Sequence, residues 1–244
     1  MRPSTGKAIG IGILMAAAAF STIAASSEKA ADRFVSQRLD MVDRQLRGRD
    51  ITDARVLQAM QAVPRHRFVP PRLQDLAYRD SPLPIGHGQT ISQPYIVALM
   101  SQLLAVEPGQ RILEIGTGSG YQAAVLAQMQ AEVFSIEIVP ELGRRAQAAL
   151  APLGYDNIRL KIGDGYQGWP EHAPFDGIIV TCAPTQVPQP LEDQLAEGGR
   201  LVIPVGESHF QQLFLMVKSG GVIRQEKIVD VRFVPMVDQK GDTY

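Results

Sequence analysis

A glycine-rich segment at 114–121, Glu-Ile-Gly-Thr-Gly-Ser-Gly-Tyr, follows a short apolar run and could bring a ligand against the backbone. Glycine occupies every second position of its centre, where a side chain would block a close approach. The dinucleotide-binding pattern G-x-G-x-x-G fits Gly116 and Gly118, but its third position is Tyr121. Phosphate binding at a helix N-terminus is therefore not the use that the segment indicates. Glu114 adds a carboxylate, which favours a ligand that carries positive charge.

S-adenosylmethionine is a ligand of this kind, because it carries a sulfonium and an ammonium group and no phosphate. The pattern E-x-G-x-G-x-G after a strand is fairly specific for its binding. We therefore expect cofactor contacts from Glu114, Gly116, Thr117, Gly118 and Gly120.

Two more acidic residues follow the next predicted strands. Glu137 lies at the end of the strand predicted at 132–138, where it could accept both hydroxyls of a ribose. Asp164 follows the strand predicted at 157–162 and could accept the adenine amine, with Gly165 allowing a close approach. Either acid could instead be a solvated strand end or an ordinary turn residue. The parallel-sheet topology brings the three strand ends together, which favours one cofactor site.

The order of the predicted elements indicates an α/β fold with a doubly wound, mostly parallel sheet. Strand patterns at 111–115, 132–138, 157–162, 175–181 and 199–205 alternate with helix patterns at 121–130, 141–150 and 191–196. Segments 211–217 and 222–231 read as a final antiparallel pair, which brings the sheet to seven strands.

The N-terminal half before this sheet reads differently. Helical spacing of apolar residues predicts a helix at 30–47, and a second helix, capped by Thr52 or Asp53, ends before Pro64. Residues 65–93 are rich in proline, glycine and polar residues, so we expect a long functional loop. We expect a helix from residue 94, and Ser92 could cap it.

The first 25 residues have the pattern of a secretory signal. Arg2 and Lys7 precede an apolar run at 8–20, and small residues follow it. The run is short for a membrane span of roughly 20 apolar residues. We expect export, to the periplasm, with cleavage near Ala25; an uncleaved anchor is the alternative, and without a working signal the protein would be cytoplasmic.

Length and composition then limit the remaining classes. The 244 residues fit the signal plus one domain at 30–244, made of an extension at 30–105 and a cofactor-binding core at 106–244. Losing Arg2 and Lys7 from 24 basic residues leaves 22 against 25 acidic ones, so a nucleic-acid partner is not indicated. Cys182 is the single cysteine, which excludes an internal disulfide. The four histidines show no metal-ligand spacing, and we expect no metal.

Five segments resemble the protein-L-isoaspartate O-methyltransferase family, over most of the chain from about residue 41 to residue 237. They are the loop at 83–95, the glycine turn at 113–121, and the segments at 163–169, 175–181 and 231–237. The glycine turn is generic to methyltransferases, whereas the loop and the C-terminal segment are specific to this family.

The resemblance implies a Rossmann-like methyltransferase fold and S-adenosylmethionine-dependent methylation of isoaspartyl residues in damaged proteins and peptides. Ser92 matches the family's active-site serine. The matched substrate-flanking positions are Thr90, Ile91, Ser92, Arg232 and Val234. Two features depart from the family: Cys182 replaces a common alanine, and the signal is unusual because most relatives are cytosolic. We expect a monomer with no stable membrane association after cleavage.

A carboxylate substrate explains why no catalytic base is evident. Its pKa near 4 leaves it ionised at neutral pH, so positioning can carry the catalysis. Ser92 would then hold one carboxylate oxygen, since no histidine is evidently paired with it to make it a nucleophile. The alternatives are a methyltransferase for another carboxylate, a small molecule or RNA, and a non-catalytic exported binding protein.

Overall fold

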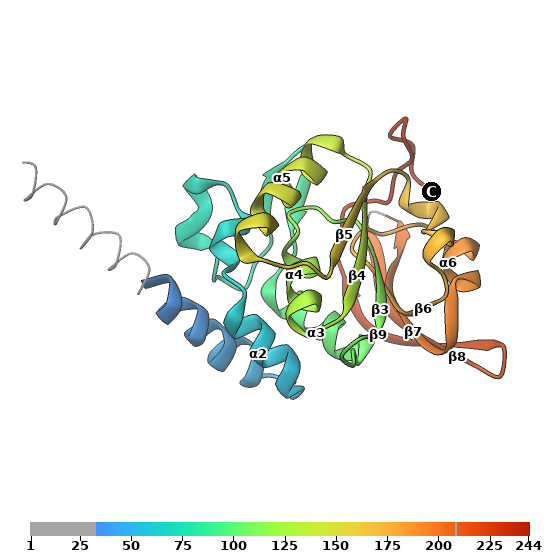
Figure 1. Cartoon of the computed structure of the whole chain (residues 1–244), viewed down its shortest axis with the longest axis horizontal. Helices are drawn as coiled ribbons and strands as arrows, with labels where there is room; N and C mark the ends of the chain where they lie inside the picture. The colour runs from blue at the N-terminus through green and yellow to red at the C-terminus, as the bar shows by residue number, and fades with distance from the viewer. Residues whose placement is uncertain (1–32, 208) are drawn as a thin grey trace, which may run out of the picture.

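The computed structural model describes residues 33–207 and 209–244 (Figure 1). The expected signal at 1–25 and the start of the expected 30–47 helix lie outside these residues. Within the described ranges, no helix is long and apolar enough to cross a membrane.

The centre of the fold is a seven-stranded sheet in the order β5-β4-β3-β6-β7-β8-β9. Its strands are β3 (Arg111–Ile115), β4 (Glu132–Glu137), β5 (Ile158–Ile162), β6 (Phe175–Val180), β7 (Leu195–Glu207), β8 (Phe210–Ser219) and β9 (Val222–Val231). Strands β3 to β7 pair in parallel, and β8 pairs antiparallel with both β7 and β9. The order of strands reverses between β3 and β6, which is where open α/β sheets bind ligands. The predicted fold class is confirmed.

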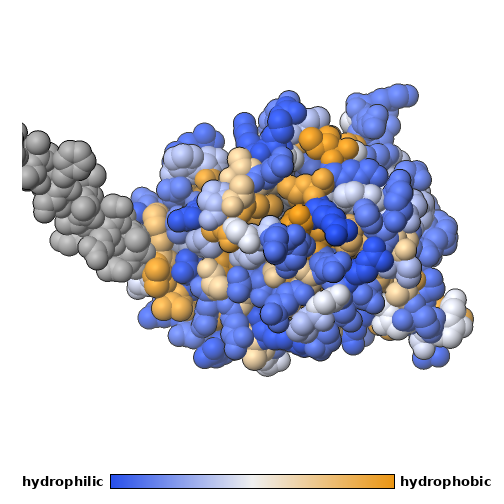
Figure 2. Space-filling model, viewed as in Figure 1, coloured by the Kyte–Doolittle hydropathy of each residue, from blue (hydrophilic) through white to orange (hydrophobic). Residues whose placement is uncertain are grey.

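Alternating side chains of the strands build a core on each face of the sheet. On β3, Ile112 joins a cluster with the helices of one face, whereas Leu113 and Ile115 join the cluster of the other face. The first face carries α2 (Ala54–Ala62), α3 (Pro94–Leu104), α4 (Tyr121–Gln128) and α5 (Pro140–Leu150), and the second carries α6 (Gln189–Asp193) (Figure 1). Hydrophilic residues cover most of the face seen in Figure 2, as expected outside such cores.

The N-terminal extension is helical, as predicted, but the long loop is more ordered than expected. Residues 33–40 form a helix that continues as a π-helical segment, Met41–Arg47. The Asp53 side chain accepts the Arg55 N–H at 2.8 Å and so caps α2. In place of a structureless loop at 65–93, two short 3₁₀ helices, Arg65–Phe68 and Pro71–Leu76, precede a hairpin of β1 (Leu83–Gly86) and β2 (Gln89–Ile91).

The helix expected at 191–196 is shifted toward the N-terminus. Helix α6 ends at Asp193, and Leu195 already belongs to β7, where it pairs with Phe175 of β6. Pairing with the neighbouring strand thus overrides the local helical pattern.

Candidate active site

A cavity of about 520 Å³ opens at the carboxyl ends of β3, β4 and β6. Four segments enclose it: the hairpin and loop at 89–93, the glycine turn, the end of β4 and the C-terminal segment at 230–237. Ten of the predicted site residues line it: Thr90, Ile91, Ser92, Gly116, Thr117, Gly118, Glu137, Gly165, Arg232 and Val234. Glu114, Gly120 and Asp164 do not.

The glycine turn keeps the cavity wall at the level of the backbone. Gly116 has φ 94°, and a Cβ on it would lie 2.5 Å from the Thr181 Oγ1. That hydroxyl donates to the Gly116 carbonyl at 2.6 Å, so β6 fixes the turn. Glycine at 116 therefore lets the turn pack against Thr181, and Gly116 and Gly118 line the cavity without side chains. Thr181 was missed by the sequence reasoning, since nothing marks it apart from its place after a buried strand.

Glu137 holds the turn from the side of β4. The Gly118 N–H donates to its Oε2 at 2.6 Å, and the Val139 N–H donates to its Oε1 at 2.9 Å. Burial raises the pKa of Glu137, and the hydrogen bonds from Val139 and Gly118 oppose that rise. Each carboxylate oxygen retains a lone pair that can accept a further hydroxyl. Glu137 therefore lines the cavity with acceptor capacity to spare.

Glu114 is not where the sequence reasoning expected it. Its side chain is fully buried behind the cavity wall, and the Ser135 hydroxyl donates to Oε2 at 2.5 Å. Burial raises the pKa of Glu114 to about 8, and the charge of Glu137 raises it further, against the Ser135 hydrogen bond. Because strand residues alternate between faces, Glu114 projects away from the ligand edge. A charged Glu114 in contact with a cationic ligand was thus the wrong expectation.

Gly120 also serves the packing rather than the cavity. A Cβ on it would lie 3.2 Å from the Ala146 Cβ of α5 and 3.3 Å from Leu150. Glycine at this position lets α5 approach the start of α4, and Gly120 does not line the cavity.

Asp164 caps the short turn Gly165–Gln167. Its Oδ1 accepts the Tyr166 N–H at 2.9 Å, and its Oδ2 accepts the hydroxyl of Tyr244. The ordinary turn role weighed for Asp164 is therefore present. Gly165, the next residue, lines the cavity, whereas Asp164 itself does not.

Ser92 lies in the loop that joins the β1–β2 hairpin to α3. Its carbonyl accepts from Arg65 Nη2 at 2.7 Å, and Arg65 Nε donates to the Ala77 carbonyl at 2.7 Å. The guanidinium is fully buried, 4.9 Å from the ring centre of Tyr121, and burial lowers the pKa of Arg65 to about 10. The capping role considered for Ser92 is not seen, because the N-cap of α3 is Gln93 and no side chain caps it. Arg65, missed from the sequence, fixes the serine loop from beneath.

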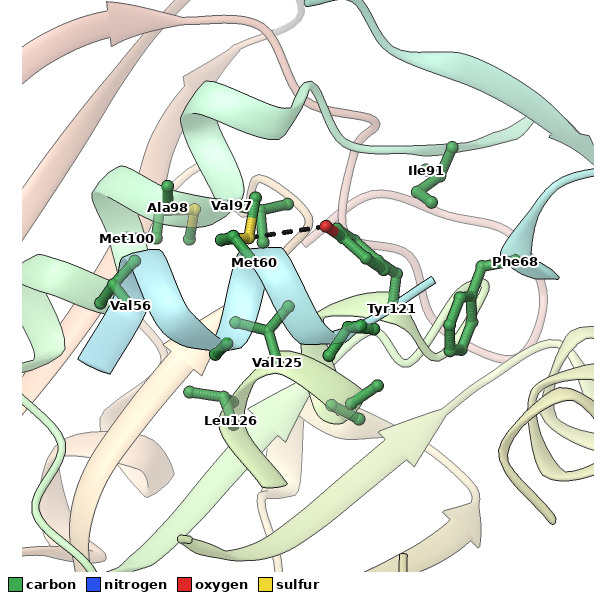
Figure 3. Packing of buried hydrophobic residues seen from close by; sticks show 14 of the residues in the cluster. Val56, Met60, Phe68, Ile91, Val97, Ala98, Met100, Tyr121, Val125 and Leu126 are labelled. Atoms are coloured by element: carbon green, nitrogen blue, oxygen red, sulfur yellow. Dashed lines mark hydrogen bonds between the residues drawn. The ribbon is translucent and has the colours of Figure 1, made fainter. Parts of the chain in front are cut away.

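The serine loop and the glycine turn share one core. Figure 3 shows Tyr121, the first residue of α4, with its hydroxyl directed at the Met60 sulfur, 3.5 Å away. Ile91 and Val97, on either side of the serine loop, project into the same cluster. The serine loop and the start of the helix after the glycine turn therefore pack on the same hydrophobic cluster.

The C-terminal segment is pinned beside the cavity by Gln211 of β8. Its amide oxygen accepts the Phe233 N–H at 2.6 Å, and its amide nitrogen donates to the Phe233 carbonyl at 3.2 Å. The Ala183 N–H donates to the Val234 carbonyl at 2.8 Å, which ties the segment to the loop after β6. Arg232 is exposed and lines the cavity.

Cys182 lines the cavity as a neutral thiol. Burial raises its pKa to about 12, and the charge of Glu137 adds to this. In the described part of the chain, no group of three or more His, Cys, Asp or Glu side chains could hold a metal ion. The site thus offers a nucleoside-binding edge and a positioning loop, without an evident base or nucleophile.

The doubly wound sheet, the glycine turn at its switch point and the acid that ends β4 define a Rossmann-like methyltransferase. The model of the protein-L-isoaspartate(D-aspartate) O-methyltransferase family matches residues 36–241, and this chain belongs to that family.

Several relatives align with this chain over nearly their whole lengths. A protein-L-isoaspartate O-methyltransferase of Gloeobacter violaceus is 58% identical over 201 residues, 82% of this chain and 98% of that protein. One from Methanoculleus marisnigri is 51% identical, over 86% of this chain and 96% of its own. A crystal structure from Plasmodium falciparum, described as this enzyme in complex with S-adenosyl-L-homocysteine, matches with a TM-score of 0.72 at 30% identity, over 82% of this chain and 97% of that one.

Proposed function

We propose that this protein transfers a methyl group from S-adenosylmethionine to the free α-carboxylate of L-isoaspartyl residues in damaged proteins and peptides, the step that begins their repair. One observation carries the assignment to this site: a single cavity joins the glycine turn and Glu137 to the serine loop and the C-terminal segment. Relatives that are 58% and 51% identical over 82% and 86% of this chain carry this enzyme's name, and the methyl donor's product occupies the related Plasmodium falciparum structure.

The residues present fit the donor. Gly116 and Gly118 line the cavity without side chains, which leaves their backbone available to a ligand. Glu137 would accept the ribose hydroxyls, and Gly118 and Gly165 would contact the nucleoside through their backbones. When bound, S-adenosylmethionine supplies a methyl group on a positively charged sulfur, which a carboxylate oxygen takes to form an ester and leave a neutral thioether.

The chain's own contribution is orientation and the exclusion of water. The Ser92 hydroxyl, half-buried in the cavity wall, would donate to one carboxylate oxygen and leave the other free to react. Arg65 holds the carbonyl of the same residue, so the hydroxyl is presented from a fixed loop. Thr90, Ile91, Arg232 and Val234 would flank the peptide. Correct orientation alone can supply roughly 7–11 kcal/mol of barrier reduction.

Methyl transfer to matched peptides tests this function. An isoaspartyl peptide and its aspartyl twin are incubated with the protein and donor labelled in the methyl group. We expect labelling of the isoaspartyl peptide alone, and the label should be released by mild base, as an ester is. Equal labelling of both peptides would contradict the repair function, and cofactor binding without any labelling would identify a binding protein.

Export is the second part of the proposal. Arg2, Lys7 and the apolar run at 8–20 support a secretory signal, and the family match begins only at residue 36. N-terminal sequencing of protein from a periplasmic fraction should start near Ser26. Full-length protein confined to the cytoplasm would contradict export while leaving the enzymatic assignment untouched.

A further inference from the structure

Two tyrosines contact Asp164, the residue before the cavity-lining Gly165, and the function above assigns neither of them. The rings of Tyr166 and Tyr244 stack with centroids 4.1 Å apart and planes 24° apart. The Tyr166 N–H donates to Oδ1 of Asp164 at 2.9 Å, and the Tyr244 hydroxyl donates to Oδ2. Both oxygens of one carboxylate are therefore held, one of them by a side chain 80 positions away.

The segment that carries Tyr244 is itself tied down. The Asp238 N–H donates to the Asp242 carbonyl at 2.8 Å, which closes a turn. The Tyr244 N–H donates to the carbonyl of Met236 at 3.2 Å, and its own carbonyl accepts the Thr185 N–H at 2.8 Å. Met236 lines the cavity, so the tyrosine is anchored to the wall of the site.

We propose that Tyr244 is a cofactor-positioning residue, which fixes the carboxylate of Asp164 in the plane where it accepts the adenine amine. This inference rests on the proposed function, because it needs a nucleoside beside Gly165. Each carboxylate oxygen has two lone pairs, so both keep one after binding Tyr166 and Tyr244. The stacked rings also limit water around the carboxylate, which strengthens its remaining hydrogen bonds.

The tyrosine is suited to remain a donor under all working conditions. Burial and the hydrogen bond to Asp164 together raise the pKa of Tyr244 to about 12. The hydroxyl therefore keeps its proton at neutral and mildly alkaline pH, and the orientation of Asp164 does not change with pH in that range.

Calorimetric titration with S-adenosylhomocysteine tests the inference in the full chain. Tyr244→Phe keeps the stacked ring and loses the hydroxyl, so we expect about tenfold weaker binding, the effect of one hydrogen bond to a charged group. Tyr244→Ala should weaken binding further. Turnover at saturating donor and the KM for an isoaspartyl peptide should stay within about twofold. Tyr155→Phe, which loses a hydroxyl bonded to Gln128 away from the cavity, is the matched control and should bind as the parent does.

A second probe separates positioning from simple support of the fold. S-inosylhomocysteine lacks the exocyclic amine, so Tyr244→Phe should reduce the preference for adenosyl over inosyl ligand about tenfold. Asp164→Asn should remove most of the effect of Tyr244→Phe, because the two act through one contact. Unchanged or tighter binding by both Tyr244 variants would overturn the inference, since tighter binding would mean that the tyrosine competes with the nucleoside. An unaltered base preference would also overturn it. If the parent chain binds neither ligand, the proposed function itself fails.

Discussion

Glu114 should make the unliganded protein less stable as the pH rises from about 5 to about 8. Burial raises the pKa of this carboxyl to about 8 from its ordinary 4.5. Between these values the folded chain holds a proton that the unfolded chain has released. The contribution of the protonated form is therefore complete below pH 4.5 and is lost as the pH rises through 8.

The size of this effect follows from the shift. Each pH unit in the window removes about 1.4 kcal/mol from the free energy of unfolding, so the whole window amounts to something on the order of 5 kcal/mol. Glu114→Gln mimics the protonated acid and can keep the contact with Ser135. We expect the variant to match the parent protein near pH 5 and to exceed its stability by several kcal/mol, on the order of 3 to 5, at pH 8.

Urea unfolding at a series of pH values measures this difference. Trp169, the single tryptophan, lies edge-on to the buried ring of Phe134 at 5.8 Å, so its fluorescence reports the loss of the core. Glu107→Gln is the control, because Glu107 is exposed and its hydrogen bond with Arg55 lowers its pKa, away from this window. A stability difference between Glu114→Gln and the parent that stays constant from pH 5 to 8 would refute the reasoning.

Four further substitutions probe the site. Ser92→Ala should lower kcat by about 10- to 100-fold, with S-adenosylhomocysteine affinity within about twofold, as steady-state rates and calorimetry would show. Glu137→Ala should weaken cofactor binding by about 100-fold in the same titration, through the loss of two charge-assisted hydrogen bonds. Arg65→Met should lower the free energy of unfolding by about 3 kcal/mol in urea, because two loop carbonyls lose a charged donor. Cys182→Ala should leave kcat within about twofold, and the parent thiol should react slowly with iodoacetamide at pH 7.5, as a pKa of about 12 implies.

The fold could be predicted from the sequence wherever burial of a strand or helix face produces a regular spacing of apolar residues. Strands β3 and β6 are covered on both faces, so they read as short, mostly apolar runs between turns. The region at 65–93 could not be resolved in this way. Its 3₁₀ helices and the β1–β2 hairpin depend on packing beneath the serine loop, while its prolines and glycines give only the signal of a loop.

In the candidate site, too, some residues could be predicted from a local sequence pattern and others depend on contacts between distant segments. Gly116, Gly118 and Glu137 belong to strand ends whose convergence follows from topology, so the sequence was enough to bring them together. Arg65 and Tyr244 act on partners 27 and 80 positions away, and no local pattern marks such a contact. The expectation for Glu114 has a different problem. The sequence gives the residue type, but the burial of this side chain, which raises its pKa, depends on the face of the strand from which it projects.

The neutral state of Glu114 and Cys182 bears on how the site favours its reaction. A carboxylate and a sulfonium combine to give a neutral ester and a neutral thioether, so charge disappears on the way to products. Surroundings of low polarity then stabilise the transition state relative to the separated charges. Burial raises the pKa of Glu114 to about 8 and of Cys182 to about 12, which keeps both groups largely neutral at pH 7. Because the substrate carboxylate is already ionised, the protein needs no base. It needs to orient the reacting groups against a cavity wall of low polarity.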